Sequence, residues 1–477
     1  MYPTIQLYIA GIWRDAAEGG SQPVLNPATG EAIGAVPLAG PADLDAAVAA
    51  AVAGFAVWRE TPALKRSDLL RKAAGLLRER ADEIARVMTL EQGKRLSEAR
   101  LEAQSAAEVI EWFAEEGRRA YGQLIPSRSP DVTQVAVREP VGPVAAFTPW
   151  NFPINQAVRK ISAALAAGCS VVLKGPEETP GSVAALVRVF ADAGLPEGVL
   201  NLVYGVPSEV SEHLIPHPAI RKISFTGSTS VGKHLASLAG RHMKRVTMEL
   251  GGHAPALVFD DANLDLAVKL LSIQKFWNAG QACVSPSRFL VQQGVYDAFV
   301  AKFAAAAKGY TVGDGMAKET RMGPLANARR VEAMEALVAD ALEKGARLVT
   351  GGRRVAGGGF LFEPTVLADV PQTARIMNEE PFGPIAAIRP FATEAEAIGE
   401  ANRLDYGLAA YAFTGSARTA RTLGARIESG MVAINSITLA LPELPFGGVK
   451  DSGYGSEGGE EAISAYLTTK YISQAIA

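Results

Sequence analysis

The chain has 477 residues, of which 48% are hydrophobic and 20% are charged. It is about three times as long as a typical domain of ~150 residues, so we expect two or three packed units and exclude a peptide, a lone small domain or a disordered chain. Lysine and arginine number 47, and aspartate and glutamate 50. The resulting net charge of −3 offers no broad electrostatic surface for nucleic acid or an anionic membrane, so small-molecule chemistry is the leading class of function.

The first part of the chain is expected to form short strands and then a helical layer. Residues 7–13 and 24–36 have the apolar runs and turn residues that are typical of strands. From residue 43 to about residue 121, leucine and isoleucine recur at three-to-four spacing in an alanine-rich background, with charges on the other face. This pattern predicts helices that cover one side of a sheet.

Between residues 132 and 248, apolar runs alternate with segments of helical length. The runs that we interpret as strands lie at 144–147, 170–173, 200–203, 222–225 and 245–248. The intervening helices are expected at 155–167, 181–193, 207–215 and 228–239. Such alternation is typical of an α/β fold with a mostly parallel, doubly wound sheet.

A second alternating series extends from residue 256 to residue 434, with helices expected at 264–277, 296–307, 328–344 and 394–402. Two α/β units in tandem therefore account for the length. In the tail, the G-x-G-x-x-G pattern at 453–458 is interpreted as a flexible loop, because no buried strand precedes it. Residues 465–476 are expected to be extended, which suits a strand added to the sheet edge of another subunit.

The two cysteines, Cys169 and Cys283, lie far apart, and neither has a second cysteine or a histidine beside it at metal-ligand spacing. We therefore expect no metal centre and no disulfide framework, which fits a reducing cytoplasm. Residues 1–20 lack the basic stretch and apolar core of a signal peptide, and the apolar run at 161–173 is shorter than the roughly 20 residues that span a bilayer. The expectation is a cytoplasmic protein without a membrane partner.

Three polar or reactive side chains are candidates for covalent chemistry. Cys283 follows a predicted helix, Glu249 ends a predicted strand before two glycines, and Asn151 stands between prolines at another strand end. Taken singly, they are a buried apolar thiol, a solvated carboxylate and a turn asparagine. Together they offer a nucleophile, a general base and an amide that can donate to an oxyanion.

Residues 227–233 match the phosphate loop of nucleotide hydrolases up to the last position, where His234 replaces the serine or threonine that should hold magnesium. Imidazole is a poor ligand for that ion, so nucleotide hydrolysis is disfavoured. The segment still joins a strand to a helix, so its backbone N–H groups either face an anion such as a pyrophosphate or form an ordinary turn.

Six short stretches resemble, in the expected order, the NAD(P)-dependent aldehyde dehydrogenase superfamily across essentially the whole chain. They are Thr148-Pro-Trp-Asn-Phe-Pro153, Phe225-Thr-Gly-Ser228, Met248-Glu-Leu-Gly-Gly252, Gly280-Gln-Ala-Cys283 with Arg288, Glu379-Glu-Pro-Phe-Gly-Pro384, and Pro445-Phe-Gly-Gly448 with Lys450 and Ser452-Gly453. Residues 450–459 are most similar to the succinate semialdehyde and α-ketoglutarate semialdehyde dehydrogenase branch.

The resemblance implies a Rossmann-like NAD-binding domain, an α/β catalytic domain and a small β extension for oligomerisation. The NAD-binding domain would comprise residues 1–122 and 141–250, and the catalytic domain residues 251–450. Residues 123–140 and 451–477 would form the bridging segment of a homodimer or homotetramer.

The resemblance also implies roles for individual residues. Cys283 would be the nucleophile, Glu249 the base that activates water, and Asn151 with the Cys283 N–H the oxyanion hole, while Lys160 matches a lysine near a proton-exit path. The implied cofactor residues are Trp150, Lys174, Glu177, Gly227, Ser228, Glu380 and Phe382. Because a carboxylate at Glu177 would repel a 2′-phosphate, we expect NAD rather than NADP.

The substrate is expected to be a small-molecule aldehyde. The branch typically holds a distal carboxylate with two arginines, and this chain has Arg159 at one of those positions but Trp277 at the other. Trp277, with Phe152 and Trp150 nearby in sequence, favours an aromatic or longer aliphatic body, with an acid group that reaches Arg159; alternatively, Trp277 turns into the core. A coenzyme A-acylating enzyme, against which Glu249 argues, and a non-catalytic binding protein remain as alternatives.

Overall fold

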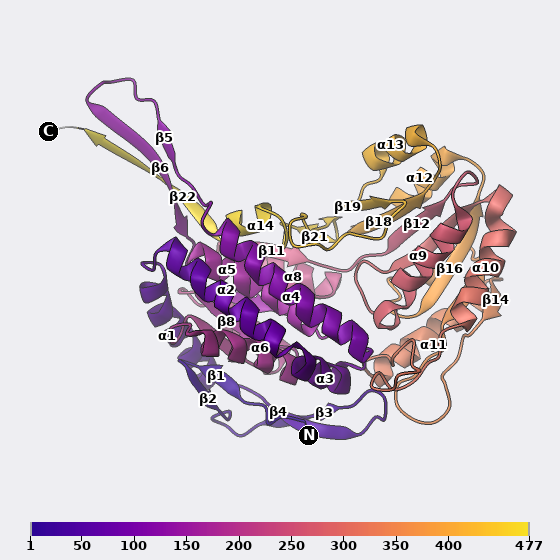
Figure 1. The fold of residues 1–477 in the computed structure, drawn as a ribbon, viewed down its shortest axis with the longest axis horizontal. Coiled ribbons are helices and arrows are strands. Elements are labelled where there is room, and N and C mark those ends of the chain that lie inside the picture. The colour runs from indigo at the N-terminus through magenta and orange to yellow at the C-terminus, as the bar shows by residue number, and fades with distance from the viewer. Residues whose placement is uncertain (1, 476–477) are drawn as a thin grey trace.

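The computed structural model describes residues 2–475 and contains two open α/β sheets, from which a long β arm projects (Figure 1). Each sheet lies within its own hydrophobic core. The first is an eight-stranded sheet with the order β2-β1-β9-β8-β7-β10-β11-β21. Its strands are β1 (Leu7–Ile9), β2 (Ile12–Arg14), β7 (Val144–Phe147), β8 (Val171–Lys174), β9 (Leu200–Val203), β10 (Lys222–Thr226), β11 (Arg245–Glu249) and β21 (Gly453–Tyr454).

The central strands of this sheet are parallel, from β9 through β8, β7 and β10 to β11. Strands β7 to β10 are buried along their whole length, which explains why their sequences are mostly apolar. The edges are antiparallel, with β1 on β9 and β21 on β11. The predicted doubly wound α/β sheet is therefore confirmed.

The helices that connect the parallel strands are α5 (Pro153–Ala167), α6 (Pro180–Ala193), α7 (Pro207–Leu214) and α8 (Thr229–Arg241). The first three begin with proline, whose missing N–H costs nothing in the first turn. Helices α5 and α6 end at Gly168 and Gly194, which have φ of 96° and 99°, a conformation that favours glycine.

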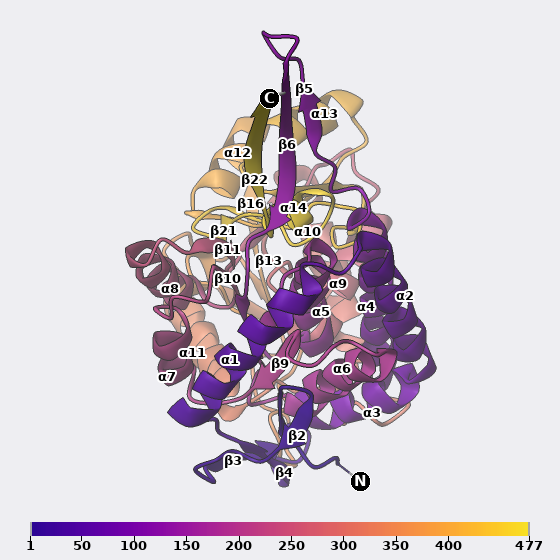
Figure 2. The same cartoon turned by 90° about the vertical axis from the view of Figure 1, so that its left-hand side faces the viewer.

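The four N-terminal helices are α1 (Pro41–Trp58), α2 (Ala63–Glu79), α3 (Ala81–Gln92) and α4 (Leu96–Glu116). Helices α2, α3 and α4 form the predicted layer and pack on α5 and α6, whereas α1 packs separately on β8 and β9. Helix α4 packs on α2, α3 and α5 (Figures 1 and 2). Among residues 2–475, α1 is the one helix that is long and apolar enough to cross a bilayer by length and composition. It packs here against β9, α7 and β8, which is the position of a helix that covers a sheet.

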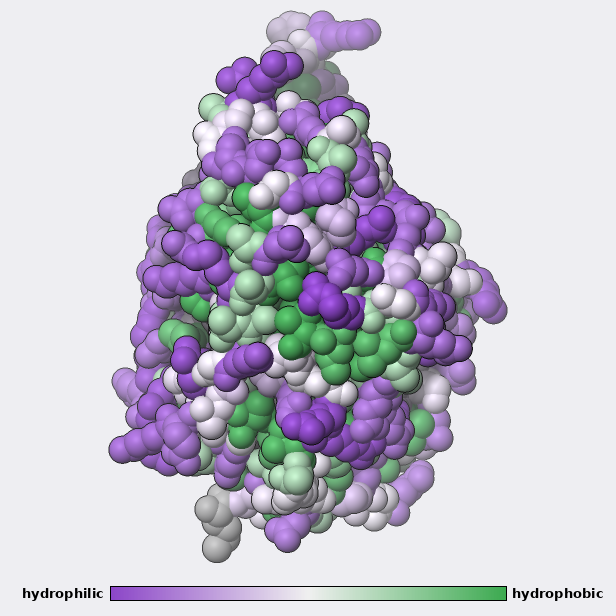
Figure 3. Space-filling view, turned by 90° about the vertical axis from the view of Figure 1, so that its right-hand side faces the viewer, coloured by the Kyte–Doolittle hydropathy of each residue, from purple (hydrophilic) through white to green (hydrophobic). Residues whose placement is uncertain are grey.

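The second sheet has seven strands in the order β14-β15-β16-β13-β12-β18-β19, all parallel except β14. They are β12 (Ala254–Val258), β13 (Pro286–Gln292), β14 (Arg347–Thr350), β15 (Thr365–Ala368), β16 (Ile385–Phe391), β18 (Ala409–Phe413) and β19 (Met431–Ile434). The helices of this unit are α9 (Leu264–Phe276), α10 (Tyr296–Lys308), α11 (Ala328–Glu343), α12 (Glu394–Asn402) and α13 (Ala417–Arg426). Viewed from the side of α10 and β14, the surface is mostly hydrophilic, with hydrophobic patches between the polar side chains (Figure 3).

The arm is a three-stranded antiparallel sheet in which β6 (Val132–Pro140) lies between β5 (Gln123–Ile125) and β22 (Leu467–Ala475). It extends away from the body of the molecule (Figures 1 and 2). The extended tail predicted for 465–476 is thus found as β22, although Ile476 lies outside the described residues. One edge of β22 pairs in register over nine residues with β6 of its own chain, and its other edge is open, so the addition of this strand to another subunit's sheet stays a prediction.

The glycine-rich segment 453–458, expected to be a flexible loop, is instead fixed against the first sheet. Gly453 and Tyr454 form β21, which pairs with Glu249 and Met248 of β11. A Cβ on Gly453 would lie 1.8 Å from the Met248 carbonyl oxygen, so only glycine permits this close approach. The short helix α14 (Glu461–Ser464) then leads into the arm. The remaining strands form two small pairs, β3 (Ser21–Leu25) with β4 (Ala32–Pro37) and β17 (Tyr406–Gly407) with β20 (Val449–Lys450).

Candidate active site

Two of the three candidate catalytic residues follow or end strands at the carboxyl edge of the first sheet, and the third lies on a loop that leads into the second sheet. Asn151 lies between β7 and α5, Glu249 is the last residue of β11, and Cys283 lies on the loop before β13. Asn151 and Glu249 are buried, and Cys283 is half-buried. Ligands of α/β proteins bind at such strand ends, and this location agrees with the sequence-based prediction.

Hydrogen bonds tie Asn151 to the loop that carries Cys283. Its side-chain Nδ2 donates to the Gln281 carbonyl oxygen at 3.1 Å, two residues before the cysteine. The Nδ2 of Asn278 donates both to the Asn151 carbonyl oxygen at 2.9 Å and to the Gln281 carbonyl oxygen at 3.2 Å. The predicted oxyanion donor and the predicted nucleophile are therefore brought together by one hydrogen-bond network.

Glu249 is a buried carboxylate without a hydrogen-bond partner at either oxygen among the described residues. Burial raises its pKa well above the ordinary value, and the neighbouring Glu457 carboxylate raises it further, whereas Lys160 and Arg159 act in the opposite direction. A Cβ on Gly447 would lie 3.2 Å from Glu249 Oε1, so the loop of the Pro445–Gly448 motif lies against this side chain. A desolvated carboxylate of this kind suits a general base.

Lys160 forms a buried ion pair with Glu457 and donates to Thr226 Oγ1 at 2.6 Å. Glu457 also accepts a hydrogen bond from Ser224 Oγ at 3.1 Å. Both charges of the pair act electrostatically on the Glu249 carboxylate, in opposite directions. Sequence reasoning singled out Lys160 but not Glu457, because a glutamate in a glycine-rich tail has the pattern of an exposed residue.

The Cys283 thiol has a pKa raised to about 12, first by burial and then by the carboxylates of Glu380 and Glu249. It is therefore protonated in the resting site and needs a proton acceptor before it can attack. Cys169, in contrast, is fully buried, and its Sγ lies 3.4 Å from the Tyr466 carbonyl oxygen. This confirms the interpretation of Cys169 as a core residue.

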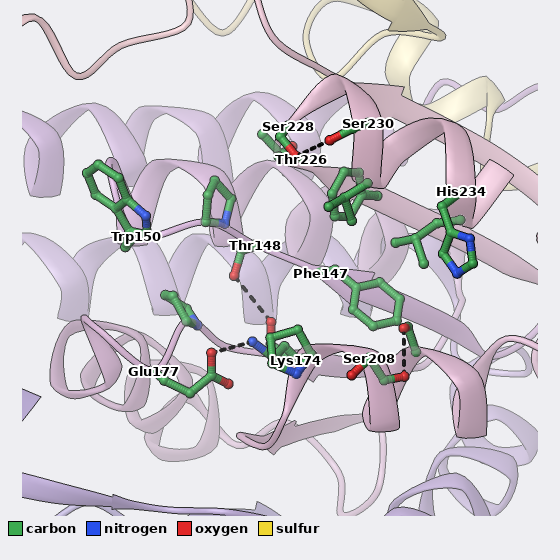
Figure 4. A pocket seen from close by; sticks show the side chains of 18 of the residues that line it. Phe147, Thr148, Trp150, Lys174, Glu177, Ser208, Thr226, Ser228, Ser230 and His234 are labelled. Atoms are coloured by element: carbon green, nitrogen blue, oxygen red, sulfur yellow. Dashed lines mark hydrogen bonds and ion pairs between the residues drawn. The ribbon is translucent and has the colours of Figure 1, made fainter. Parts of the chain in front are cut away.

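A cavity of about 630 Å³ lies at the carboxyl ends of β7, β8 and β10 (Figure 4). Five of the predicted cofactor residues line it, namely Trp150, Lys174, Glu177, Gly227 and Ser228. Lys174 Nζ donates to Glu177 Oε2 at 2.6 Å, and Glu177 Oε1 accepts from the Gly205 N–H at 3.1 Å. Several lining residues carried no sequence signal for a cofactor, among them Glu178, Ser208, Ser211 and His234.

Two features of the cavity suit the adenosine and pyrophosphate side of a dinucleotide. Ser228, which lines the cavity, is the N-cap of α8, and its side chain makes no capping hydrogen bond. The backbone N–H groups of the first turn are therefore not bonded to the Ser228 side chain. A Cβ on Gly227 would lie 2.4 Å from the ring of Phe225, so this approach to the helix start requires glycine. A helix N-terminus at a glycine turn suits a pyrophosphate, and the Lys174 and Glu177 side chains suit ribose hydroxyls.

The other two predicted cofactor residues lie on a loop of the second unit. Glu380 Oε1 accepts from the Gly252 N–H at 3.1 Å, and burial raises the pKa of this carboxyl to about 7. The Phe382 ring meets the Trp150 ring edge to face, with centroids 5.6 Å apart. This contact links the loop to the residues that line the cavity.

The three predicted substrate residues have separate surroundings. Arg159 is buried; it donates to the carbonyl oxygens of Glu457 at 3.0 Å and Ala440 at 2.8 Å, and stacks on Phe446. Trp277 follows α9 and lines a cavity of about 220 Å³, shared with Arg95, Leu101, Ile273, Tyr310 and Arg321. The Phe152 ring lies 4.0 Å from Lys94 Nζ. No contact between described residues joins Trp277 to Arg159.

The sequence model of the aldehyde dehydrogenase family matches residues 13–472. The chain belongs to this family. This aldehyde dehydrogenase is 49% identical over 472 residues to the 4-(hydroxymethyl)benzenesulfonate dehydrogenase of Comamonas testosteroni, covering 99% of this chain and 98% of that protein. It is 44% identical over 467 residues to the NADP-dependent succinate-semialdehyde dehydrogenase of Escherichia coli, covering 98% and 97%.

The solved NAD⁺ complex of an aldehyde dehydrogenase from Bacillus cereus superposes with a TM-score of 0.97 at 35% identity, over 100% of this chain and 97% of that chain. The predicted fold, the enzyme class and the semialdehyde dehydrogenase branch are therefore confirmed. Members of the family use NAD(P) and act on small aldehydes, so this aldehyde dehydrogenase is an NAD(P)-dependent oxidoreductase.

Proposed function

We propose that this aldehyde dehydrogenase oxidises an aldehyde with an aromatic body and an anionic group to the carboxylic acid, through a thioester on Cys283. The observation that carries the catalytic part is the buried Glu249 carboxylate, which has no partner among residues 2–475 and lies close enough to Cys283 to raise the pKa of its thiol. A site that keeps such a carboxylate desolvated is suited to activate water.

In the first step, Cys283 Sγ adds to the aldehyde carbon and forms a thiohemiacetal. The Nδ2 of Asn151 and the backbone N–H of Cys283 hold the negative oxygen. Asn151 Nδ2 donates to the Gln281 carbonyl oxygen at 3.1 Å, so the amide already points toward the loop that carries Cys283. When the thiohemiacetal forms, the amide exchanges this acceptor for the negative oxygen. The proton of the thiol passes to Glu249, whose raised pKa makes its carboxylate a competent acceptor.

The residues that line the cavity of about 630 Å³, together with Glu380 and Phe382, would hold NAD(P), which would supply the hydride acceptor for the carbon attached to Cys283. Glu249 first releases the thiol proton toward solvent. Its carboxylate oxygen then removes a proton from the water that attacks the thioester, so that the free acid leaves and the Cys283 thiolate regains a proton. Lys160 and Glu457, which form an ion pair beside Glu249, hold that proton on its way out. Glu249 argues against a coenzyme A-acylating enzyme, because acyl transfer to a thiol needs no base for water.

Support for the substrate comes from Arg159 and Trp277. Only two of the five guanidinium donors of Arg159 are engaged by the described residues, so the remaining donors are free for an anionic group. Trp277 and Tyr310 give a cavity of about 220 Å³ two aromatic walls, and Arg95 and Arg321 line the same cavity. The relative from Comamonas testosteroni, whose name refers to a benzenesulfonate, has the same combination of an aromatic ring and an acid group in its substrate.

We further propose a preference for NAD over NADP, because the Glu177 carboxylate lines the cofactor cavity and would repel a 2′-phosphate. Because the relative from Escherichia coli is named as NADP-dependent, the preference of this chain is tested directly, by comparing kcat/KM for the two cofactors.

We keep the division into an NAD-binding domain (1–122 and 141–250), a catalytic domain (251–450) and a bridging segment (123–140 and 451–477) as a proposal. The open edge of β22 and the exposed Leu124 and Tyr471 support a homo-oligomer built through the arm.

The decisive experiment is a panel of aldehydes assayed by formation of NADH or NADPH, with and without coenzyme A. The panel contains 4-formylbenzenesulfonate, 4-carboxybenzaldehyde, benzaldehyde and succinate semialdehyde, and Cys283→Ala is the inactive control. We expect the free acid as product, and the highest kcat/KM for the two anionic aromatic aldehydes. Succinate semialdehyde preferred by a hundredfold would refute the substrate assignment, and Trp277→Arg should move the ratio toward that short acid.

A further inference from the structure

Lys94 and Glu102 form a fully buried ion pair to which neither the sequence nor the proposed mechanism assigns a role. Lys94 lies on the connection between α3 and α4, and Glu102 lies in the second turn of α4. Their side chains are 0% and 1% exposed. A buried ion pair costs desolvation energy that the attraction often fails to recover, so it is poor evidence for stability, and its contacts need another explanation.

Both partners contact the segment that carries Asn151. Lys94 Nζ donates to the Asn151 carbonyl oxygen at 2.8 Å and lies 4.0 Å from the centre of the Phe152 ring. Glu102 Oε1 accepts hydrogen bonds from the N–H groups of Ile154 at 3.0 Å and Asn155 at 3.1 Å. Two charged side chains from the helical layer thus hold the backbone on both sides of Pro153.

The local sequence explains why this segment needs outside support. Pro149 and Pro153 lack an N–H, so the turn cannot close its own hydrogen bonds at these positions. The N-cap of α5 is Phe152, which has no polar side chain for the free N–H groups of the first turn. Glu102 supplies the missing acceptor from α4, and its negative charge is favourable at that helix end.

The Asn151 carbonyl oxygen accepts two hydrogen bonds from opposite parts of the molecule. One comes from Lys94 Nζ on the side of the helical layer, and the other, at 2.9 Å, comes from Asn278 Nδ2 on the cysteine loop. Together they fix the orientation of the Asn151 backbone, and with it the direction in which its side-chain amide points toward Gln281 and Cys283.

We propose that Lys94 and Glu102 are positioning residues that hold the Asn151 amide in place for the oxyanion, and that their effect on the reaction passes through Asn151. This inference rests on the proposed function, in which Asn151 donates to that oxygen. A displacement of about 1 Å in a catalytic group costs roughly 100-fold in rate, and loss of a whole oxyanion donor costs roughly 100- to 1,000-fold. Loosening the segment should therefore cost about 10- to 100-fold in kcat/KM.

The test is a double-mutant cycle between the pair and Asn151. Lys94→Met is combined with Glu102→Gln, because the glutamine keeps an oxygen for the two N–H groups and leaves no unpaired buried charge. The paired change is made in the wild-type chain and in Asn151→Ala. Glu102→Asp alone is the milder variant, which serves if the paired change does not fold, because it keeps the charge beside Lys94 and shortens only the reach to the two N–H groups. Asp43→Asn is the matched control, since Asp43 is also a buried carboxylate that accepts N–H groups near a helix start and pairs with an arginine, Arg14.

We expect the paired change to lower kcat by about 10- to 100-fold in the wild-type chain and by less than threefold in Asn151→Ala. The dissociation constant for NAD should stay within twofold, and Asp43→Asn should retain the wild-type kcat. Equal losses in the two backgrounds, or no loss in the wild-type chain, would overturn the proposal. If Asn151→Ala by itself left kcat at the wild-type value, this result would instead contradict the oxyanion role of Asn151 in the proposed function.

Discussion

The raised pKa of the Cys283 thiol leads to a quantitative prediction for its alkylation in the absence of cofactor. With a pKa of about 12, only about one thiol in 10,000 is ionised at pH 8, compared with about a quarter of an unperturbed cysteine of pKa ~8.5. A more basic thiolate is intrinsically more nucleophilic, and a Brønsted coefficient of about 0.4–0.5 recovers roughly 25- to 60-fold of that deficit. Cys283 should therefore react about 40- to 100-fold more slowly than a free thiol at pH 8.

The pH dependence of the alkylation rate follows from the direction of this pKa shift. Because the thiol is the stable form up to about pH 12, the rate of alkylation by iodoacetamide should rise about tenfold per pH unit between pH 7 and 9.5, without a plateau. Modification of the Cys283 peptide is followed by mass spectrometry, with the buried Cys169 as internal control. Glu380→Gln removes the larger of the two carboxylate contributions and should accelerate the reaction at pH 8. A plateau with a midpoint at or below pH 8.5 would refute the assignment of a desolvated thiol.

Three further predictions concern the base, the cofactor and the arm. Glu249→Gln should lower kcat by about 100- to 10,000-fold in the steady-state NADH assay, because the base for both the thiol and the water is lost, and a wild-type kcat would contradict that role. Glu177→Ala should raise the ratio of kcat/KM for NADP to that for NAD by about tenfold or more, and an unchanged ratio would remove Glu177 as the determinant. Deletion of residues 467–477, which removes β22 from the arm, should lower the mass measured by light scattering during gel filtration; an unchanged mass would contradict an oligomer built through the arm.

The parallel strands could be predicted almost to the residue because their burial is uniform. β7 and β9 have the predicted boundaries, β8 is shifted by one residue, and β10 and β11 each extend one residue further. In a sheet covered on both faces most residues of a strand are apolar, with single buried polar residues such as Asn201 in β9, and such a run is recognisable without knowing its neighbours. Helix α13 was missed for the opposite reason, since Leu423 is its one buried residue and the remainder is polar or small.

Trp277 shows where local patterns stop being informative. The pattern predicted a helix to residue 277, whereas α9 ends at Phe276 and a tight turn follows. In that turn Asn278 and Ala279 have φ of 49° and 53°, an unusual conformation for residues with side chains. The turn is held by hydrogen bonds to Asn151, which is more than a hundred residues away, so no local rule could place it.

Some residues of the candidate site could be predicted because the chemistry requires them, and others could not because only the geometry of the fold requires them. Cys283, Glu249 and Asn151 could be inferred because each reaction step needs a functional group of a particular kind, and few residue types supply it. Three further residues contact backbone groups or other charges and not the reacting atoms, namely Lys94, Glu102 and Glu457. A lysine or glutamate at many positions in a sequence could make such contacts, so the sequence alone does not identify them.

Their burial therefore becomes informative only when the fold is known. A lysine and a glutamate eight residues apart on an amphipathic stretch suggest a solvated helix face, yet these two are among the least exposed charges in the described chain. Desolvating a charged side chain is costly, and a fold tolerates it where a geometric constraint outweighs the cost. Among residues 2–475, the buried charges Glu249, Lys160 and Glu457 are linked by mutual interactions, and the Lys94–Glu102 pair holds the adjoining Asn151 segment. Charges are also buried elsewhere, as at Asp43, Lys222 and Arg288, but these two ion pairs are the ones whose contacts or charges reach the proposed oxyanion donor and the proposed base.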